Sequence, residues 1–171
     1  EIWSHARFGA HQGQGIGIWQ TEPACAANNA VANYTSTGTS AGHPLRMATV
    51  IRNVTPLAPI QCVTGSVLPT LAQANAATPQ ITVVSHSAAV QQATNNSTDY
   101  LIYDRNWDNN IYATGITIAT AASNQGTIAN FAVGSPARAV NAITIGNIDI
   151  DSNPDVIFYR SSWRNSTLGN E

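Results

Sequence analysis

Short β-branched segments alternate along this chain with segments of helical periodicity, and this alternation constrains the fold more than any other feature. The strand-like segments are rich in Ile, Val and Thr, and Pro, Gly or a polar residue follows each of them. They cover residues 15–22, 60–63, 81–84, 116–122 and 141–146, with a further candidate at 156–159. Strands that alternate with helices predict an α/β fold with a mainly parallel central sheet and right-handed crossovers.

The helical segments carry their own local signals. Pro44 stands where the first turn of a helix favours proline, and the residues up to Arg52 give an apolar face, so we expect a helix with His43 at its N-terminal end. A short helix is expected over 70–77. Residues 88–110 predict two helices with a break at 95–98, because Asn and Ser compete with helical hydrogen bonds there. Residues 26–42 are rich in Asn, Thr, Ser and Gly and are predicted to form a loop.

The charge balance excludes several classes of protein. Nine acidic and seven basic side chains give a formal net charge of -2, and only 9% of the 171 residues are charged. Such a chain lacks the basic footprint of a nucleic-acid binder. It also has no apolar run of about 20 residues, so we expect no membrane span. Surface polarity supplied by Ser, Thr and Asn favours a secreted or periplasmic protein.

The two cysteines allow either one disulfide or two free thiols. Cys25 follows the first predicted strand, and Cys62 lies in the next. Neighbouring parallel strands could bring the two residues within bridging range, so we expect a disulfide in an oxidising compartment. The alternative is a pair of buried thiols, which pack well in cores. No second Cys or His stands at ligand spacing from either residue, and we expect no metal and no cofactor.

Three polar residues stand at ends of predicted elements where an α/β fold gathers functional groups. Glu22 ends the first strand, His43 begins the first long helix, and Asn124 follows the strand at 116–122. An imidazole can act as general base, a carboxylate can orient it, and an amide can donate to an oxyanion. Taken singly, each residue has a plainer interpretation, as a turn acid, a helix cap or a turn residue.

Several segments resemble the subtilisin-like serine proteases (subtilases, peptidase family S8), in order and in rough spacing. Ala121-Ala-Ser-Asn-Gln-Gly126 is similar to the turn that carries the oxyanion Asn of that family. The sequence from Ser135 to Gly146 is similar to a distinctive strand of the same family. The sequence from Gly13 to Glu22 is similar to the strand that carries the first catalytic residue of that family. The resemblance implies a three-layer fold, incomplete in this chain. It also implies catalytic roles for Glu22 as orienter, His43 as base and Asn124 as oxyanion donor.

The same resemblance implies a substrate-lining strand that ends in Val84, Ser85, His86 and Ser87 and pairs with an extended polypeptide. The sequence also departs from the family pattern. Glu22 replaces the usual Asp, the motif that follows His43 is degenerate, and no Gly-Thr-Ser nucleophile motif follows Asn124. We therefore expect residues 1–171 to be the N-terminal two-thirds of a catalytic domain. A C-terminal fragment on a second chain, made by cleavage after Glu171, would supply the serine nucleophile.

Two functions remain open on these observations. The first is a serine endopeptidase with a Glu/His/Ser triad, in which this chain supplies the acid, the base and the oxyanion residue. The second is a peptide-binding module that keeps the fold and the peptide groove but has lost catalysis. The departures at Glu22 and after His43 favour the second function, and the retained Glu, His and Asn favour the first.

Overall fold

The computed structural model describes residues 11–29, 31–88, 100–127, 132–149 and 156–162, and its chain divides into two compact units. The first unit comprises residues 1–87 and 114–116, and the second comprises residues 88–113 and 117–171. Each unit is described by itself.

Four parallel strands form the sheet of the first unit, in the order β2-β3-β1-β4. The strands are β1 (Gly17–Glu22), β2 (Tyr34–Thr35), β3 (Ile60–Thr64) and β4 (Ile81–His86). Every residue of β1 is buried, as expected for a parallel strand with neighbours on both sides and helices on its faces. The register places Glu22 opposite Thr64 of β3 and Thr21 opposite His86 of β4.

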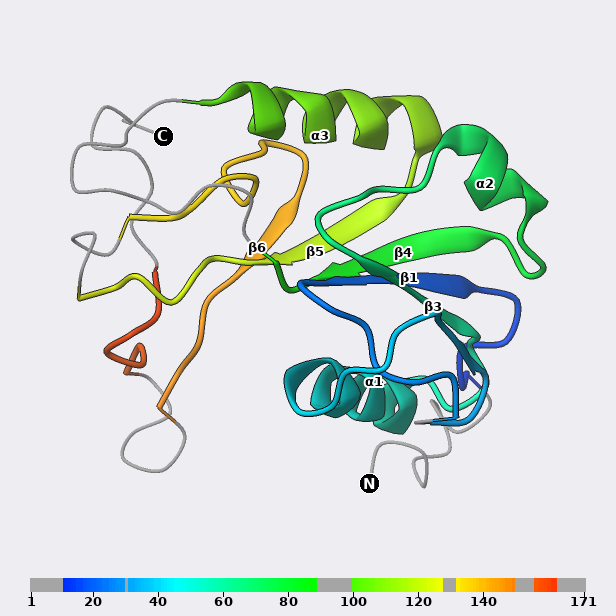
Figure 1. Ribbon diagram of the computed structural model, residues 1–171. Helices are drawn as coiled ribbons and strands as arrows, with labels where there is room; N and C mark the ends of the chain where they lie inside the picture. The colour runs from blue at the N-terminus through cyan, green and yellow to red at the C-terminus, as the bar shows by residue number, and fades with distance from the viewer. Residues whose placement is uncertain (1–10, 30, 89–99, 128–131, 150–155, 163–171) are drawn as a thin grey trace. The chain divides into compact units, whose positions relative to one another are not determined.

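Two helices belong to this unit, and Figure 1 shows α1 (His43–Val54) and α2 (Leu71–Ala76) on opposite sides of its strands. Proline in the first turn starts α1. A capping box starts α2: Thr70 accepts from the backbone N–H of Gln73, whose side chain accepts from the backbone N–H of Thr70.

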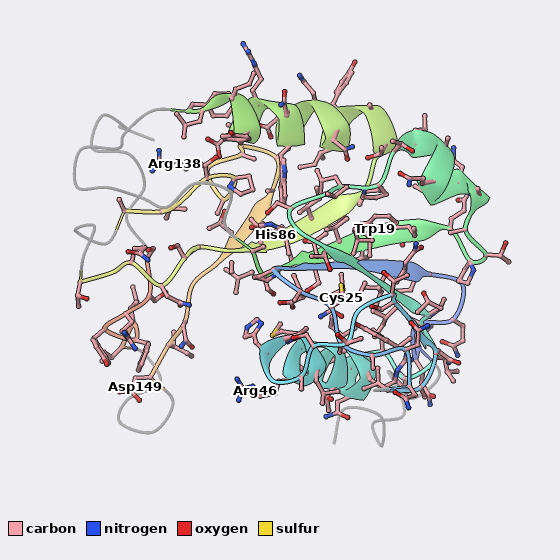
Figure 2. All side chains as sticks on the ribbon, viewed as in Figure 1. Trp19, Cys25, Arg46, His86, Arg138 and Asp149 are labelled. Carbon is pink, nitrogen blue, oxygen red and sulfur yellow. A yellow bond between two sulfur atoms is a disulfide. The ribbon has the colours of Figure 1, made fainter. Side chains whose placement is uncertain are left out.

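Small and β-branched residues fill the space between α1 and the sheet. Ala48 of α1 is buried with Ile18 of β1 and Ile60 of β3. A disulfide between Cys25 and Cys62 lies in the same cluster, with a Cα–Cα separation of 5.8 Å. Cys25 is labelled in Figure 2, beside the strands.

The second unit contains α3 (Ile102–Thr114) and the parallel pair β5 (Thr117–Ala121) and β6 (Ile143–Ile145). Two buried carboxylates on α3 organise its surroundings. Asp104 accepts from Ser135 Oγ at 2.9 Å, and Asp108 accepts from the backbone N–H groups of Val140 and Asn141 at 3.0 and 2.7 Å. These hydrogen bonds hold the segment that precedes β6 against the helix.

The α/β fold class predicted from the sequence is confirmed, with parallel pairing between the strands and helices beside them. Most predicted elements are found within a few residues of their expected bounds, and β4 runs two residues further than expected, to His86. In the described part of the chain, no helix is long and apolar enough to cross a membrane.

Two expectations about local structure are wrong. The segment 156–159 forms no strand and contributes a single antiparallel bridge from Ile157 to Ile148, because only one pair of residues comes into register. The segment 26–42 is not all loop, because Tyr34 and Thr35 pair with β3. The break expected at 95–98 lies outside the described residues.

A candidate acid–base site at the carboxyl end of β1

Glu22 is the last residue of β1 and is completely buried. Side chains alternate along a strand, so Ile18, Gln20 and Glu22 share one face of the sheet. Ile18 packs in the cluster that contains Ala48 of α1, which identifies this face as the one covered by α1. Burying a carboxylate costs free energy unless it is hydrogen-bonded, so the partners of Glu22 indicate how its charge is stabilised.

His43 is the first residue of α1 and lies against this carboxylate. Its Nδ1 atom is 2.9 Å from Oε2 of Glu22, and its side chain is 55% exposed. The helix begins after Gly42, whose φ of 79° belongs to the left-handed region that favours glycine. The turn at Gly42 therefore helps to bring the imidazole to the end of β1.

Gln20 supplies the second partner of the carboxylate. Its Nε2 atom donates to Oε1 of Glu22 at 3.0 Å and to the carbonyl oxygen of Pro44 at 3.2 Å. Sequence reasoning missed this residue, because a single Gln in a short strand carries no pattern of its own. The available signal was its spacing of two from Glu22, which places both side chains on one face.

This arrangement determines how the imidazole is used. An ionised carboxylate only accepts hydrogen bonds, so the Nδ1 atom of His43 must carry a proton toward Glu22. In the neutral imidazole, Nε2 is then unprotonated and can accept a proton. Among the described residues, nothing is hydrogen-bonded to Nε2, and the ring is half-exposed. A half-exposed imidazole oriented by a buried carboxylate has the geometry that general-base chemistry requires.

Asn124 lies in the second unit, in the turn that follows β5. Its side chain is exposed, and the residue before it, Ser123, has a φ of 106° that few residues other than glycine adopt. Backbone hydrogen bonds fix this turn, with Ser162 N–H donating to Ser123 and Gly126 N–H donating to Arg160, both at 3.0 Å. A donor role for Asn124 toward an oxyanion stays a prediction.

The proposed substrate-lining residues lie at the end of β4. Val84 and His86 are buried, whereas Ser85 and Ser87 are half-buried. The Nε2 atom of His86 is 3.0 Å from Ser66 Oγ, and burial lowers the pKa of its imidazole to about 4. The buried side chains belong to the packing of the unit, so a substrate would meet this segment through its backbone and its two serines. That pairing also stays a prediction.

Comparisons with known proteins identify a fold. No protein-family model matches the chain, and no curated protein matches it. Among solved structures, the chain is similar to one described as the structure of the prenylagaramide maturation protease PagA. The match has a TM-score of 0.61 and 13% sequence identity, and covers 91% of this chain and 61% of that one. The chain shares its fold with a protease and spans about three-fifths of that protease's length.

These comparisons correct the family assignment that the motifs suggested. With no matching family model and 13% identity to the solved protease, membership of the subtilisin-like serine proteases does not stand. The motifs on which it depended are short runs of Ala, Ser, Asn and Ile, and the chain is rich in these residues. Such runs recur by chance in a chain of biased composition, so their order along the sequence does not establish membership of the family. The shared fold is what the comparisons support.

Proposed function

We propose that this chain supplies the acid–base residues of a peptidase, with His43 as general base and Glu22 as the carboxylate that orients it. One observation carries the proposal: a fully buried carboxylate lies 2.9 Å from Nδ1 of a half-exposed imidazole at the carboxyl end of a parallel strand. That edge is where α/β sheets gather reacting groups. The fold shared with a maturation protease agrees with this chemistry.

The base needs a nucleophile, and we propose a serine on polypeptide outside these 171 residues. Among the described residues no hydroxyl is hydrogen-bonded to His43. Ser40 is close in sequence, but its Oγ donates to the carbonyl of Ala41 at 3.3 Å. Since the chain spans 61% of the structure it resembles, a C-terminal segment of the same protease is the proposed partner.

In the proposed reaction, Nε2 of His43 takes the proton of the serine hydroxyl as the oxygen attacks the carbonyl carbon of the scissile bond. The buried carboxylate stabilises the imidazolium that forms. Asn124 is the proposed donor to the oxyanion, and the imidazolium then protonates the leaving amine as the C–N bond breaks. Water, deprotonated by the same imidazole, hydrolyses the acyl-serine that remains and restores the hydroxyl. The substrate would be an extended polypeptide that lies along the end of β4, from Val84 to Ser87.

A peptide-binding module without catalysis is the second candidate. The observation that favours it is the absence of a nucleophile beside His43 in the described part of the chain. Such a module would bind an extended peptide through the end of β4 and would bind it equally well after His43→Ala.

A fluorophosphonate probe on the native protein, isolated with any polypeptide that accompanies it, separates the two functions. For a peptidase we expect covalent labelling of a serine outside residues 1–171, and loss of labelling in His43→Ala. For a binding module we expect no labelling under conditions that label a reference serine protease. Binding of unmodified peptides would then persist in His43→Ala.

A further inference from the structure

Gln20 occupies a place between the two halves of the acid–base site. It is completely buried in β1, and its Nε2 group donates to Oε1 of Glu22 and to the carbonyl oxygen of Pro44. Pro44 follows His43 directly in the first turn of α1. One amide group thus connects the carboxylate to the backbone that carries the imidazole.

The contacts also fix the orientation of the amide. Both neighbours at 3.0 and 3.2 Å are acceptors, one a carboxylate oxygen and one a carbonyl oxygen. If the amide were flipped, its oxygen would face two other oxygens, so only the NH2 group fits there. The Oε1 atom of Gln20 itself, by contrast, is buried without a hydrogen-bond partner among the described residues.

A side chain that served only the packing of the sheet would not need this chemistry. An apolar residue of the same length would fill the space and would leave no unpartnered oxygen, although it would forgo the two donated bonds. Thr21 is the contrasting neighbour. It is equally buried, its Oγ1 also has no partner among the described residues, and it points to the opposite face of the sheet.

We propose that Gln20 is a positioning residue of this site, which holds the carboxylate of Glu22 and the first turn of α1 in the geometry that keeps the proton of His43 on Nδ1. The inference rests on the proposed function, since it assigns a role within the same acid–base pair. When the donor is removed, Oε1 of the Glu22 carboxylate loses its hydrogen-bond partner. The present rotamer of Glu22 is then less strongly stabilised. The imidazole then loses its fixed acceptor and its tautomers mix.

Nitrogen NMR of the chain itself tests this without any need for a nucleophile. Long-range proton–nitrogen spectra of ¹⁵N-histidine-labelled protein report which ring nitrogen carries the proton, at a pH well above the ordinary imidazole pKa of about 6.5. His43→Ala identifies the signals of His43. For the wild type we expect the proton on Nδ1.

Gln20→Met keeps the length of the side chain and removes the donor. We expect it to change the tautomer ratio of His43 by about tenfold toward Nε2–H, the equivalent of one ordinary hydrogen bond. Gln20→Asn keeps the amide but withdraws it by one methylene, and we expect the same direction of change. Thr21→Val is the matched control in the same strand, and its spectrum should equal that of the wild type.

The outcomes separate this inference from the function on which it rests. If the wild type holds the proton on Nδ1, and Glu22→Gln but neither Gln20 variant changes this, Gln20 has no positioning role and the acid–base pair stands. If the wild type shows the tautomer mixture of a free imidazole, the pair itself is refuted and the inference falls with it. An equal change in Thr21→Val would assign the effect to packing and overturn the role of Gln20.

Discussion

Replacing Glu22 by Gln is the most direct perturbation of the proposed chemistry, because it keeps the shape of the side chain and removes its charge. In the wild type the carboxylate lies 2.9 Å from Nδ1 of His43 and is fully buried. When the imidazole takes a proton, its positive charge faces this carboxylate. Glu22→Gln offers only a neutral amide, so the imidazolium loses its stabilising partner while the ground state changes little.

The size of the effect follows from the geometry. Two unit charges at this distance, with the effective dielectric of 20 suited to protein sites, interact by about 6 kcal/mol, or about 10⁴-fold in rate. The imidazole is 55% exposed, so water screens part of this interaction. We therefore expect Glu22→Gln to lower turnover between about 10²- and 10⁴-fold, with the larger value matching that of the corresponding Asp-to-Asn change in a serine protease triad.

The assay is steady-state peptide hydrolysis by the native protein, with His43→Ala as the floor and circular dichroism to confirm folding. Glu22→Asp is the companion variant, which keeps the charge but shortens the side chain. We expect lower activity, because the carboxylate is then too far from Nδ1 to orient the imidazole. The reasoning is refuted if Glu22→Gln folds and keeps more than about a tenth of the turnover, a cost below about 1.4 kcal/mol.

Three further predictions concern the framework of the first unit. The disulfide joins two residues that are 37 positions apart in the sequence. Replacing Cys25 and Cys62 by Ala should therefore lower the free energy of unfolding by about 3.8 kcal/mol in urea titrations. No loss would show that the bridge does not constrain the unfolded chain. Burial lowers the pKa of His86 from 6.5 to about 4, so the unfolded state binds more protons between these values. Stability should therefore fall by up to about 3 kcal/mol as the pH drops from above 6.5 to 4, and His86→Gln should remove that slope; an unchanged slope would show that His86 is not its source. A Cβ on Gly38 would clash with the carbonyl oxygen of Cys25, so Gly38→Ala should lower the free energy of unfolding by at least about 2 kcal/mol. Gly146→Ala, whose new Cβ would have its nearest neighbour at 3.3 Å, should cost less, and equal losses would contradict the packing argument.

Much of the fold could be predicted because its signals are local. Pro44 and the apolar spacing after it place α1, and the β-branched runs at 60–63 and 81–84 place β3 and β4. The two-residue strand Tyr34–Thr35 carries no such signal, because it is too short for any periodicity and forms only by pairing with β3. The segment 156–159 shows the converse: its apolar residues fit a strand, but without a continuous partner they form a single bridge.

The candidate site divides in the same way. Glu22 and His43 could be named from the sequence, since each stands at an end of a locally predicted element. That they lie 2.9 Å apart depends on how α1 packs on the sheet, which no local pattern encodes. Gln20 is less visible still, because its role depends on two contacts, to Glu22 and to Pro44, and the second crosses 24 positions of the sequence.

The burial of Glu22 links the architecture to the proposed chemistry. A parallel strand with neighbours on both sides has little access to water, so a carboxylate at its end must find its partners within the protein. The structure supplies one donor from the same strand, Gln20, and one from the helix, His43. Because the strand donor holds one oxygen of Glu22, the other oxygen is directed at the imidazole. The contact that compensates the burial of the Glu22 charge therefore also orients His43, the proposed base. A change that exposes Glu22 to water would also free the imidazole from this contact.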